Sequence, residues 1–111
     1  MIIEDTAMNN EQIYWFVTTI QDITNPNILA MRTWGFYLNE EDAIEDLACN
    51  YTDMNEGVYQ YAVIEPYRAG GPLSYAFELS RFWFKYDAEK DGYFAMNEPE
   101  QMKHYFGFAF G

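Results

Sequence analysis

Apolar residues form two different patterns in the first fifty residues, and the first pattern is that of a β-strand. The run Ile13–Ile20 (IYWFVTTI) is rich in β-branched and aromatic residues. Both of its parities are apolar, so we expect a central strand that is covered on both faces. The cluster at 24–27 predicts a turn, and residues 28–38 predict a second strand in which Gly35 marks a bulge or a close approach. Two successive strands with a short turn between them favour an antiparallel hairpin.

The second pattern of apolar residues has the period of a helix. Asn39 is a suitable N-cap, and three acids follow it in the first turn, where the helix dipole favours negative charge. Apolar residues then recur at helical spacing and carboxylates fall on the other side. The apolar side consists of Ala43, Ile44, Leu47 and Ala48. This pattern predicts an amphipathic helix over residues 40–50, followed by a polar connection over residues 51–57.

A third strand, VYQYAVI, is predicted over residues 58–64, and Pro66 is expected to end it because proline cannot donate to a strand ladder. The Gly- and Pro-rich cluster at 69–72 indicates a flexible loop. The segment over residues 74–86 has helical features early and strand features late.

The last third of the chain predicts a late β-hairpin. We expect a strand over residues 81–86, a turn over 87–92 that contains an Asp-Gly pair, and a returning strand over 93–96. Residues 99–103 can form one helical turn, and residues 105–110 predict a short terminal strand.

These elements predict an α+β fold, a small antiparallel sheet with one main amphipathic helix packed on it and a late β-hairpin. Residues 1–12 are polar and aperiodic and are predicted to be a loose N-terminal leader. Residues 13–111 are predicted to be a single domain, because 111 residues leave room for only one.

Charge changes this picture more than composition does. The chain is 50% hydrophobic, which argues against global disorder, but its 18 acids and 6 bases give a net charge of −12. Residues 1–57 hold eleven of the acids and a single base, Arg32. Such a chain cannot bind duplex DNA by neutralising phosphates over a broad surface, and anionic membranes repel it. It also has no apolar run long enough to span a bilayer.

Cysteine and histidine are too scarce for several kinds of site. Cys49 is the single cysteine, so no internal disulfide is possible and a reducing, cytoplasmic compartment is expected. His104 is the single histidine, so His and Cys cannot assemble a zinc site. Cys49 is predicted to be a small core residue rather than a nucleophile. We therefore expect no enzyme activity, no cofactor and no metal.

The candidate ligand-binding residues come from the few cations and tryptophans. Arg81, Trp83 and Lys85 share one parity of the strand predicted over 81–86, and two cations flanking an indole can stack a base and hold phosphate. An ordinary solvated face is the alternative. Arg32 lies beside Trp34 and is either a phosphate clamp or a structural ion-pair partner. The full candidate set is Arg32, Trp34, Arg68, Arg81, Trp83 and His104.

The segment 87–98 also matches part of a calcium-binding loop. Oxygen ligands and the glycine stand at positions 1, 3, 5, 6 and 12 of an EF-hand. These residues are Asp87, Glu89, Asp91, Gly92 and Glu98. Glutamate is one methylene too long at the third position, and Pro99 leaves little room for an exiting helix. The alternative is the acidic turn of a hairpin.

The acidic helix supports a different function. Residues 40–56 hold seven acids and no Lys or Arg. Carboxylates spaced along one helix face can occupy a basic groove of a partner protein, as a mimic of nucleic-acid charge. A plain solvated helix face is the alternative.

Three strings of the sequence resemble a known group of proteins. They are GFYLNEEDAIEDLACNYTDMNEGVYQYAVIEPY, the later FWFKY and GYFAMNEPE, and the terminal FGFAFG. This layout resembles small proteins encoded by phages and prophages of Firmicutes, and it is similar to the Thoeris anti-defence proteins, which sequester cyclic signalling nucleotides. The resemblance implies a homo-oligomer in the host bacterial cytoplasm, with ligand pockets near subunit boundaries and no turnover.

Two functions are therefore expected. The first is a non-enzymatic phage counter-defence protein that sequesters a small cyclic nucleotide. The second is an acidic, nucleic-acid-mimicking inhibitor of a host defence protein, of the anti-CRISPR type. In neither case does the protein bind nucleic acid or a membrane itself.

Overall fold

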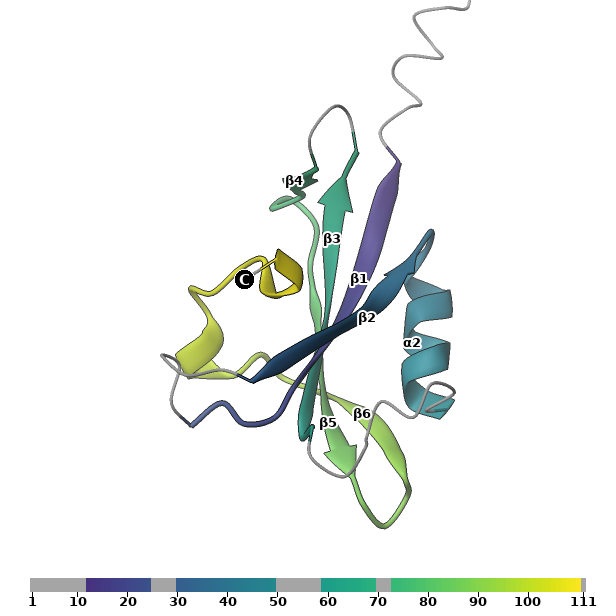
Figure 1. Cartoon of the computed structure of the whole chain (residues 1–111), viewed down its shortest axis with the longest axis vertical. Coiled ribbons are helices and arrows are strands. Elements are labelled where there is room, and N and C mark those ends of the chain that lie inside the picture. The colour runs from purple at the N-terminus through teal and green to yellow at the C-terminus, as the bar shows by residue number, and fades with distance from the viewer. Residues whose placement is uncertain (1–11, 25–29, 50–58, 70–72, 111) are drawn as a thin grey trace, which may run out of the picture.

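The computed structural model describes residues 12–24, 30–49, 59–69 and 73–110, apart from the side chain of Cys49. These residues form an antiparallel sheet, one α-helix and two short 3-10 helices (Figure 1). The strands are β1 (Ile13–Ile20), β2 (Met31–Tyr37), β3 (Tyr61–Arg68), β4 (Ser74–Tyr75), β5 (Phe82–Asp87) and β6 (Gly92–Met96). The helices are α2 (Glu40–Cys49), η1 (Glu100–Met102) and η2 (Phe108–Phe110). The α+β class and the late hairpin of β5 and β6 are as predicted.

Some predictions fall outside the described residues. These are most of the leader over 1–12, most of the turn over 24–27, the connection over 51–57, the core position of the Cys49 side chain, and most of the loop over 69–72.

The strand order is β2-β1-β3-β5-β6, with β4 pairing the end of β3. Every strand pair is antiparallel, and β1 lies between β2 and β3 as its apolar parities predicted. The register between β1 and β2 shifts between Val17 and Thr18, where β2 carries Trp34 as an extra residue. Gly35 adopts a φ of +154° at this shift, a conformation that a residue with a Cβ rarely adopts. The predicted bulge at Gly35 is therefore confirmed.

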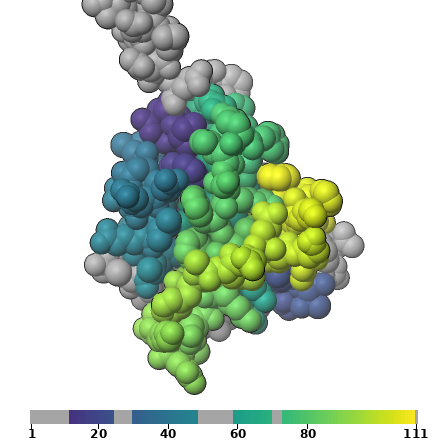
Figure 2. Space-filling view, turned by 180° about the vertical axis from the view of Figure 1, so that it is seen from behind, coloured from purple at the N-terminus to yellow at the C-terminus, as the bar shows by residue number. Residues whose placement is uncertain are grey.

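The sheet is covered on both faces by different parts of the chain. On one face Ala43 and Leu47 of α2 pack against alternate residues of β1, β3 and β5, which we call the helix-side core. On the other face Met102 and Phe108 pack against Ile20, Val63 and Trp83, which we call the C-terminal-side core. Figures 1 and 2 show the helix and the yellow C-terminal residues on opposite sides of the molecule.

The helix begins as its sequence predicts. The backbone N–H of Asp42 donates to Oδ1 of Asn39 at 2.8 Å, and Nδ2 of Asn39 donates to the Asp42 carboxylate at 3.1 Å. Ala43 and Leu47 are buried and Ile44 is half-buried, but Ala48 is exposed, so the apolar stripe is narrower than predicted.

The prediction that Pro66 ends the third strand is wrong, because β3 runs on to Arg68. Pro66 stands opposite Trp15 of β1, and its carbonyl accepts the N–H of Ala76 on the other side. The β5 pairing stops at Ile64, so no ladder hydrogen bond is missing where the proline nitrogen points.

The predicted terminal strand over residues 105–110 is also wrong. Gly107 adopts a φ of +78°, and the 3-10 helix η2 follows it. The backbone N–H groups that a strand would use are donated instead to a buried side chain, which is described next.

Candidate interaction surfaces

A buried ion pair holds the C-terminal segment to the sheet. Glu65 lies in the middle of β3 and is fully buried, and Arg81 immediately precedes β5 with its side chain 4% exposed. The carboxylate Oε2 of Glu65 and Nη1 of Arg81 are 3.4 Å apart. Nε of Arg81 also donates to Glu98 at 2.7 Å. Three elements that are distant in sequence therefore meet at this pair.

Backbone groups of the C-terminal segment complete the network. The N–H groups of Gly107 and Phe108 donate to the Glu65 carboxylate at 3.0 and 2.8 Å. Arg81 donates to the carbonyl of Met102 at 3.0 Å and to the carbonyl of Tyr105. Residues 98–108 are thus fixed across the sheet by one acid and one base, and we call Glu65 and Arg81 the clamp.

Burial alters the acidity of the groups in and around the clamp. It raises the pKa of Glu65, while the N–H of Gly107 and the charge of Arg81 act in the opposite direction. It also raises the pKa values of Tyr67 and Tyr75, and the nearby Glu65 carboxylate raises them further. The clamp holds two charges away from water, and backbone groups of the C-terminal segment bind both of them.

The open cation-and-indole face that we predicted on β5 does not exist. Trp83 is 3% exposed and packs in the C-terminal-side core, and its Nε1 donates to Glu98 at 3.2 Å. The guanidinium of Arg81 lies 4.3 Å from the ring centre of Phe106, and its side chain is only 4% exposed. Lys85 alone is exposed. The expectation failed because the C-terminal segment covers this face, and strand parity cannot reveal such a cover.

Arg32 and Trp34 lie together, but far from Arg81 in the architecture. The guanidinium of Arg32 stands 4.1 Å from the ring centre of Trp34, and Nε1 of Trp34 donates to Oγ1 of Thr19 at 2.6 Å. Trp34 packs against the helix-side core, whereas Trp83 belongs to the core on the opposite face. The structure therefore does not bring the predicted arginines and tryptophans into one pocket.

The other two candidates are separate from both groups. Arg68, at the end of β3, forms an ion pair with Glu78 beyond β4. His104 is exposed after η1. Neither lines the hollow at Lys85 and Phe94 or the groove at Tyr14, Phe16, Phe36 and Leu73.

The segment proposed as a calcium loop is a hairpin. Residues 82–87 form β5 where an EF-hand needs its entering helix. Oδ1 of Asp87 accepts the N–H groups of Glu89 and Lys90 at 2.9 and 3.3 Å, and Glu98 is bound by Arg81. Among the residues that the structure describes, no group of three or more His, Cys, Asp or Glu is placed to hold a metal ion.

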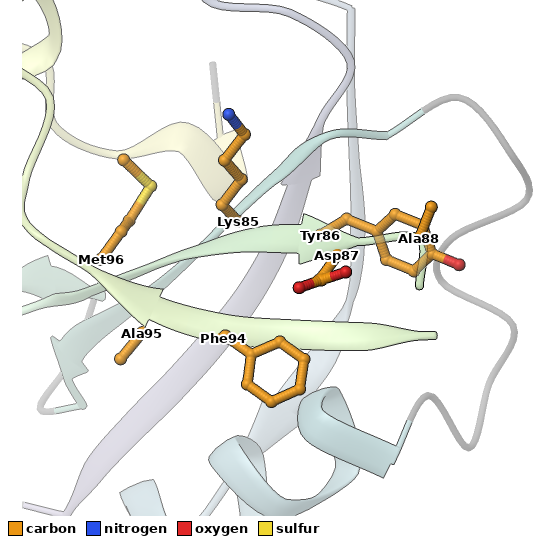
Figure 3. A pocket seen from close by; sticks show the side chains of 7 residues that line it. All are labelled: Lys85, Tyr86, Asp87, Ala88, Phe94, Ala95 and Met96. Carbon is orange, nitrogen blue, oxygen red and sulfur yellow. The ribbon is translucent and has the colours of Figure 1, made fainter. Parts of the chain in front are cut away.

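An open hollow of about 490 Å³ lies on this hairpin (Figure 3). Lys85 of β5 and Phe94 of β6 are partners in the strand register, and Figure 3 shows their side chains pointing away from each other, with Asp87 further along β5. The hollow contains one base and one acid among its lining residues, so it offers no net charge to an ionic ligand.

A continuous surface of aromatic rings extends from the C-terminal segment over β1 and β2, and we call it the aromatic face. Neighbouring ring centres are 4.7–5.3 Å apart. Its members are Tyr14, Phe16, Phe36, Tyr67, Tyr75, Phe77, Phe106 and Phe110. A groove of about 310 Å³ opens on it, lined by Tyr14, Phe16, Phe36 and Leu73. Sequence analysis missed this surface because its rings come from five segments that only the fold brings together.

The outer side of α2 carries the opposite chemistry. Glu41, Asp42 and Glu45 are exposed, and Glu40 and Asp46 are half-buried. None of these five carboxylates forms an ion pair with a base among the described residues. In contrast, four acids of the second half are each paired with a base, and these are Glu65, Glu78, Glu98 and Glu100.

Comparison with known proteins gave no relative: no family model, curated protein or solved structure matches this chain. Within the described part of the chain, no helix combines the length and the apolar character needed to cross a bilayer.

Proposed function

We propose that the protein is a non-catalytic inhibitor that binds a basic surface of a partner protein through the outer side of α2. The observation that supports this proposal is the set of five carboxylates on one helix without a single ion-paired base. In the counter-defence setting that the resemblance implies, the partner is a host protein whose basic groove binds nucleic acid.

Repulsion within the helix gives the proposal its physical basis. Glu41 and Glu45 stand four residues apart, as do Asp42 and Asp46, and like charges at this spacing destabilise a helix by about 0.2–0.5 kcal/mol per pair. A groove lined by Lys and Arg removes this repulsion on binding. Complementary fields also accelerate the encounter of the two proteins.

Nucleotide sequestration receives less support from the geometry. Arg81 and Trp83 are buried and bound by the protein's own groups, and Arg32 lies on the other face of the sheet. Neither of the two described hollows is lined by an arginine. In either of these two hollows, a ligand with several phosphates would lack the arginine donors that hold such groups most strongly.

Charge reversal on the helix tests the proposal. The immobilised protein is exposed to a bacterial lysate, and bound proteins are identified and challenged with duplex DNA. We expect a nucleic-acid-binding protein that duplex DNA displaces, since both compete for one basic groove. The double variant Glu41→Lys with Glu45→Lys should lose the partner, because the reversed charges repel its basic groove. Asp42 and the Asn39 cap remain intact, so we expect the fold of the variant to be preserved.

The matched control reverses two exposed acids elsewhere. Glu89→Lys with Glu100→Lys changes the net charge by the same amount but leaves α2 untouched. It should retain the partner. Equal binding by the helix variant and the unmodified protein would rule out α2 as the contact surface, and equal loss in both variants would reduce the effect to net charge.

A further inference from the structure

Two buried tyrosine hydroxyls beside the clamp have no hydrogen-bond partner within the part of the chain that the structure describes. They belong to Tyr67 and Tyr75, which are direct partners in the register of β3 and β4, with ring centres 5.1 Å apart. A buried hydroxyl without a partner costs free energy, and native proteins leave few such groups. The two hydroxyls therefore indicate a polar molecule that the chain itself does not supply.

The strand geometry places both hydroxyls near the clamp. Glu65 and Tyr67 are two residues apart on β3, so their side chains share one face of the sheet. The carboxylate of Glu65 is close enough for its charge to raise the pKa values of Tyr67 and Tyr75, but both hydroxyls lie outside normal hydrogen-bond geometry. Three N–H groups of the described residues bind this carboxylate, two at Oε2 and one at Oε1. Because each carboxylate oxygen can accept two hydrogen bonds, Oε1 can accept one more.

Gly107 leaves space next to one of the hydroxyls. Among the described residues other than its chain neighbours, only the hydroxyl of Tyr67 lies within 4 Å of a Cβ placed on Gly107, at 3.5 Å. Rings of the C-terminal segment lie against both tyrosines, with Phe110 centred 5.1 Å from Tyr67 and Phe106 centred 5.2 Å from Tyr75. A molecule of about the size of a methyl group, such as water, can therefore reach the Tyr67 hydroxyl beneath these rings.

The charges around the hydroxyls distinguish between classes of ligand. Glu65 and Glu98 share the single guanidinium of Arg81, so this site does not attract an anion. A metal ion lacks ligands here, since the described residues place no group of three or more His, Cys, Asp or Glu to hold one. A neutral molecule that both donates and accepts fits two hydroxyls and a carboxylate, and buried water typically makes about three hydrogen bonds.

We propose that one water molecule is bound between Tyr67, Tyr75 and Glu65, where it accepts from the two hydroxyls and donates to Oε1 of the carboxylate. This water joins β3 and β4 to the group that holds the backbone of Gly107 and Phe108. Because Tyr67 is 4% exposed and Glu65 is fully buried, the water exchanges with solvent more slowly than surface water does. The inference goes beyond the proposed function, since it concerns the clamp and not α2.

Oxygen-17 relaxation dispersion of the solvent tests this site on the full chain. The method detects water molecules that stay in a protein for longer than the protein takes to rotate, and exchange of hydroxyl protons does not affect it. The double variant Tyr67→Phe with Tyr75→Phe keeps both rings and removes both hydroxyls. We expect the dispersion amplitude to fall by the contribution of one water molecule. The folded-to-unfolded ratio should also fall at least about fivefold, which is the typical net effect of one hydrogen bond.

Tyr93→Phe is the matched control. Tyr93 is 1% exposed, and its hydroxyl donates to the carbonyl of Tyr59 at 2.9 Å, so this hydrogen bond is made within the chain. The control should lose stability but retain the dispersion amplitude of the unmodified chain.

Three outcomes would overturn the proposal. The first is a full dispersion amplitude in the double variant, and the second is a double variant that is as stable as the unmodified chain, as expected when dry, unpartnered hydroxyls are removed. The third is an equal loss of amplitude in Tyr93→Phe. Circular dichroism verifies the fold, and Tyr67→Phe alone carries the same test if the double variant does not fold, because it leaves the water with two partners. Reversing Glu41 and Glu45 does not touch this site, so the two proposals can fail separately.

Discussion

Glu65 and Arg81 are sixteen residues apart in sequence, yet their carboxylate and guanidinium lie 3.4 Å apart beneath the C-terminal segment. Each side chain compensates for the burial of the other. Isolated, either charge would be strongly destabilising in the middle of the sheet, because burial removes its hydration.

Removing one member of the clamp should therefore cost much stability. Arg81→Met leaves Glu65 buried without its ion pair, and the loss of one partner from a buried pair typically costs about 3–5 kcal/mol. Urea unfolding measured by tryptophan fluorescence provides the value. Lys103→Met, which breaks the exposed pair with Glu100, should cost less than about 1 kcal/mol. Equal losses in the two variants would contradict the clamp.

The pH dependence of stability should carry the signature of Glu65. Burial raises the pKa of Glu65 above its ordinary value of 4.5, so the native state retains this proton more tightly than the unfolded chain does. The contribution of this group is complete below pH 4.5 and is lost as the pH rises through the native pKa. Comparison with Glu65→Gln isolates it from the other carboxyls.

The measurement is the free energy of unfolding of both proteins over a series of pH values that begins below 4.5 and continues above it. The advantage of the unmodified chain over Glu65→Gln should decrease as the pH rises. An advantage that grows with pH would mean that the attraction of Arg81 and the two backbone N–H groups outweighs burial.

Local patterns predicted most elements of this fold, because strand and helix periods are written in consecutive residues. The span Ile13–Ile20 was predicted to the residue, and Asn39 was recognised as the helix cap. The terminal strand was predicted wrongly because Glu65, more than forty residues away, takes the N–H groups of Gly107 and Phe108. No window of sequence around residues 105–110 contains that competitor.

The candidate site was predicted less well for a related reason. Parity correctly separates Trp83 from Phe84, but it cannot say that each lies in a core of its own. Arg32 and Arg81 are both scarce cations in the sequence, and only the fold places the Trp34 beside Arg32 against the helix-side core and Trp83 in the core of the opposite face. Glu65 directly follows the strand predicted over residues 58–64, and an acid beside this apolar run is the sequence feature that could have pointed to the clamp.

Gly92 should be intolerant of any side chain. A Cβ at this position would stand 2.7 Å from the backbone carbonyl oxygen of Ala48, at the end of α2. Because backbone cannot move aside as a flexible side chain does, Gly92→Ala should separate the helix from the hairpin and cost about 1–3 kcal/mol. Thermal unfolding gives the shift. The control Ala95→Ser, at an exposed position of the same strand, should stay within about 0.5 kcal/mol, and a silent Gly92→Ala would show that α2 moves freely there.

Tyr37 should ionise only in strong base. Burial and the hydrogen-bonded, negatively charged Asp46 on α2 raise the pKa of Tyr37 from 10.0 to about 12. The native state therefore keeps a proton that the unfolded chain releases, and stability is lost as the pH rises from 10.0 to about 12. Carbon NMR of labelled tyrosine measures the titration directly.

Asp46→Asn should lower the pKa of Tyr37 but leave it above 10.0, since burial is the larger cause. Glu45→Gln, which neutralises an exposed neighbour on the same helix, should leave it in place; a pKa that both variants lower equally would indicate the general field of the helix instead of the contact with Asp46.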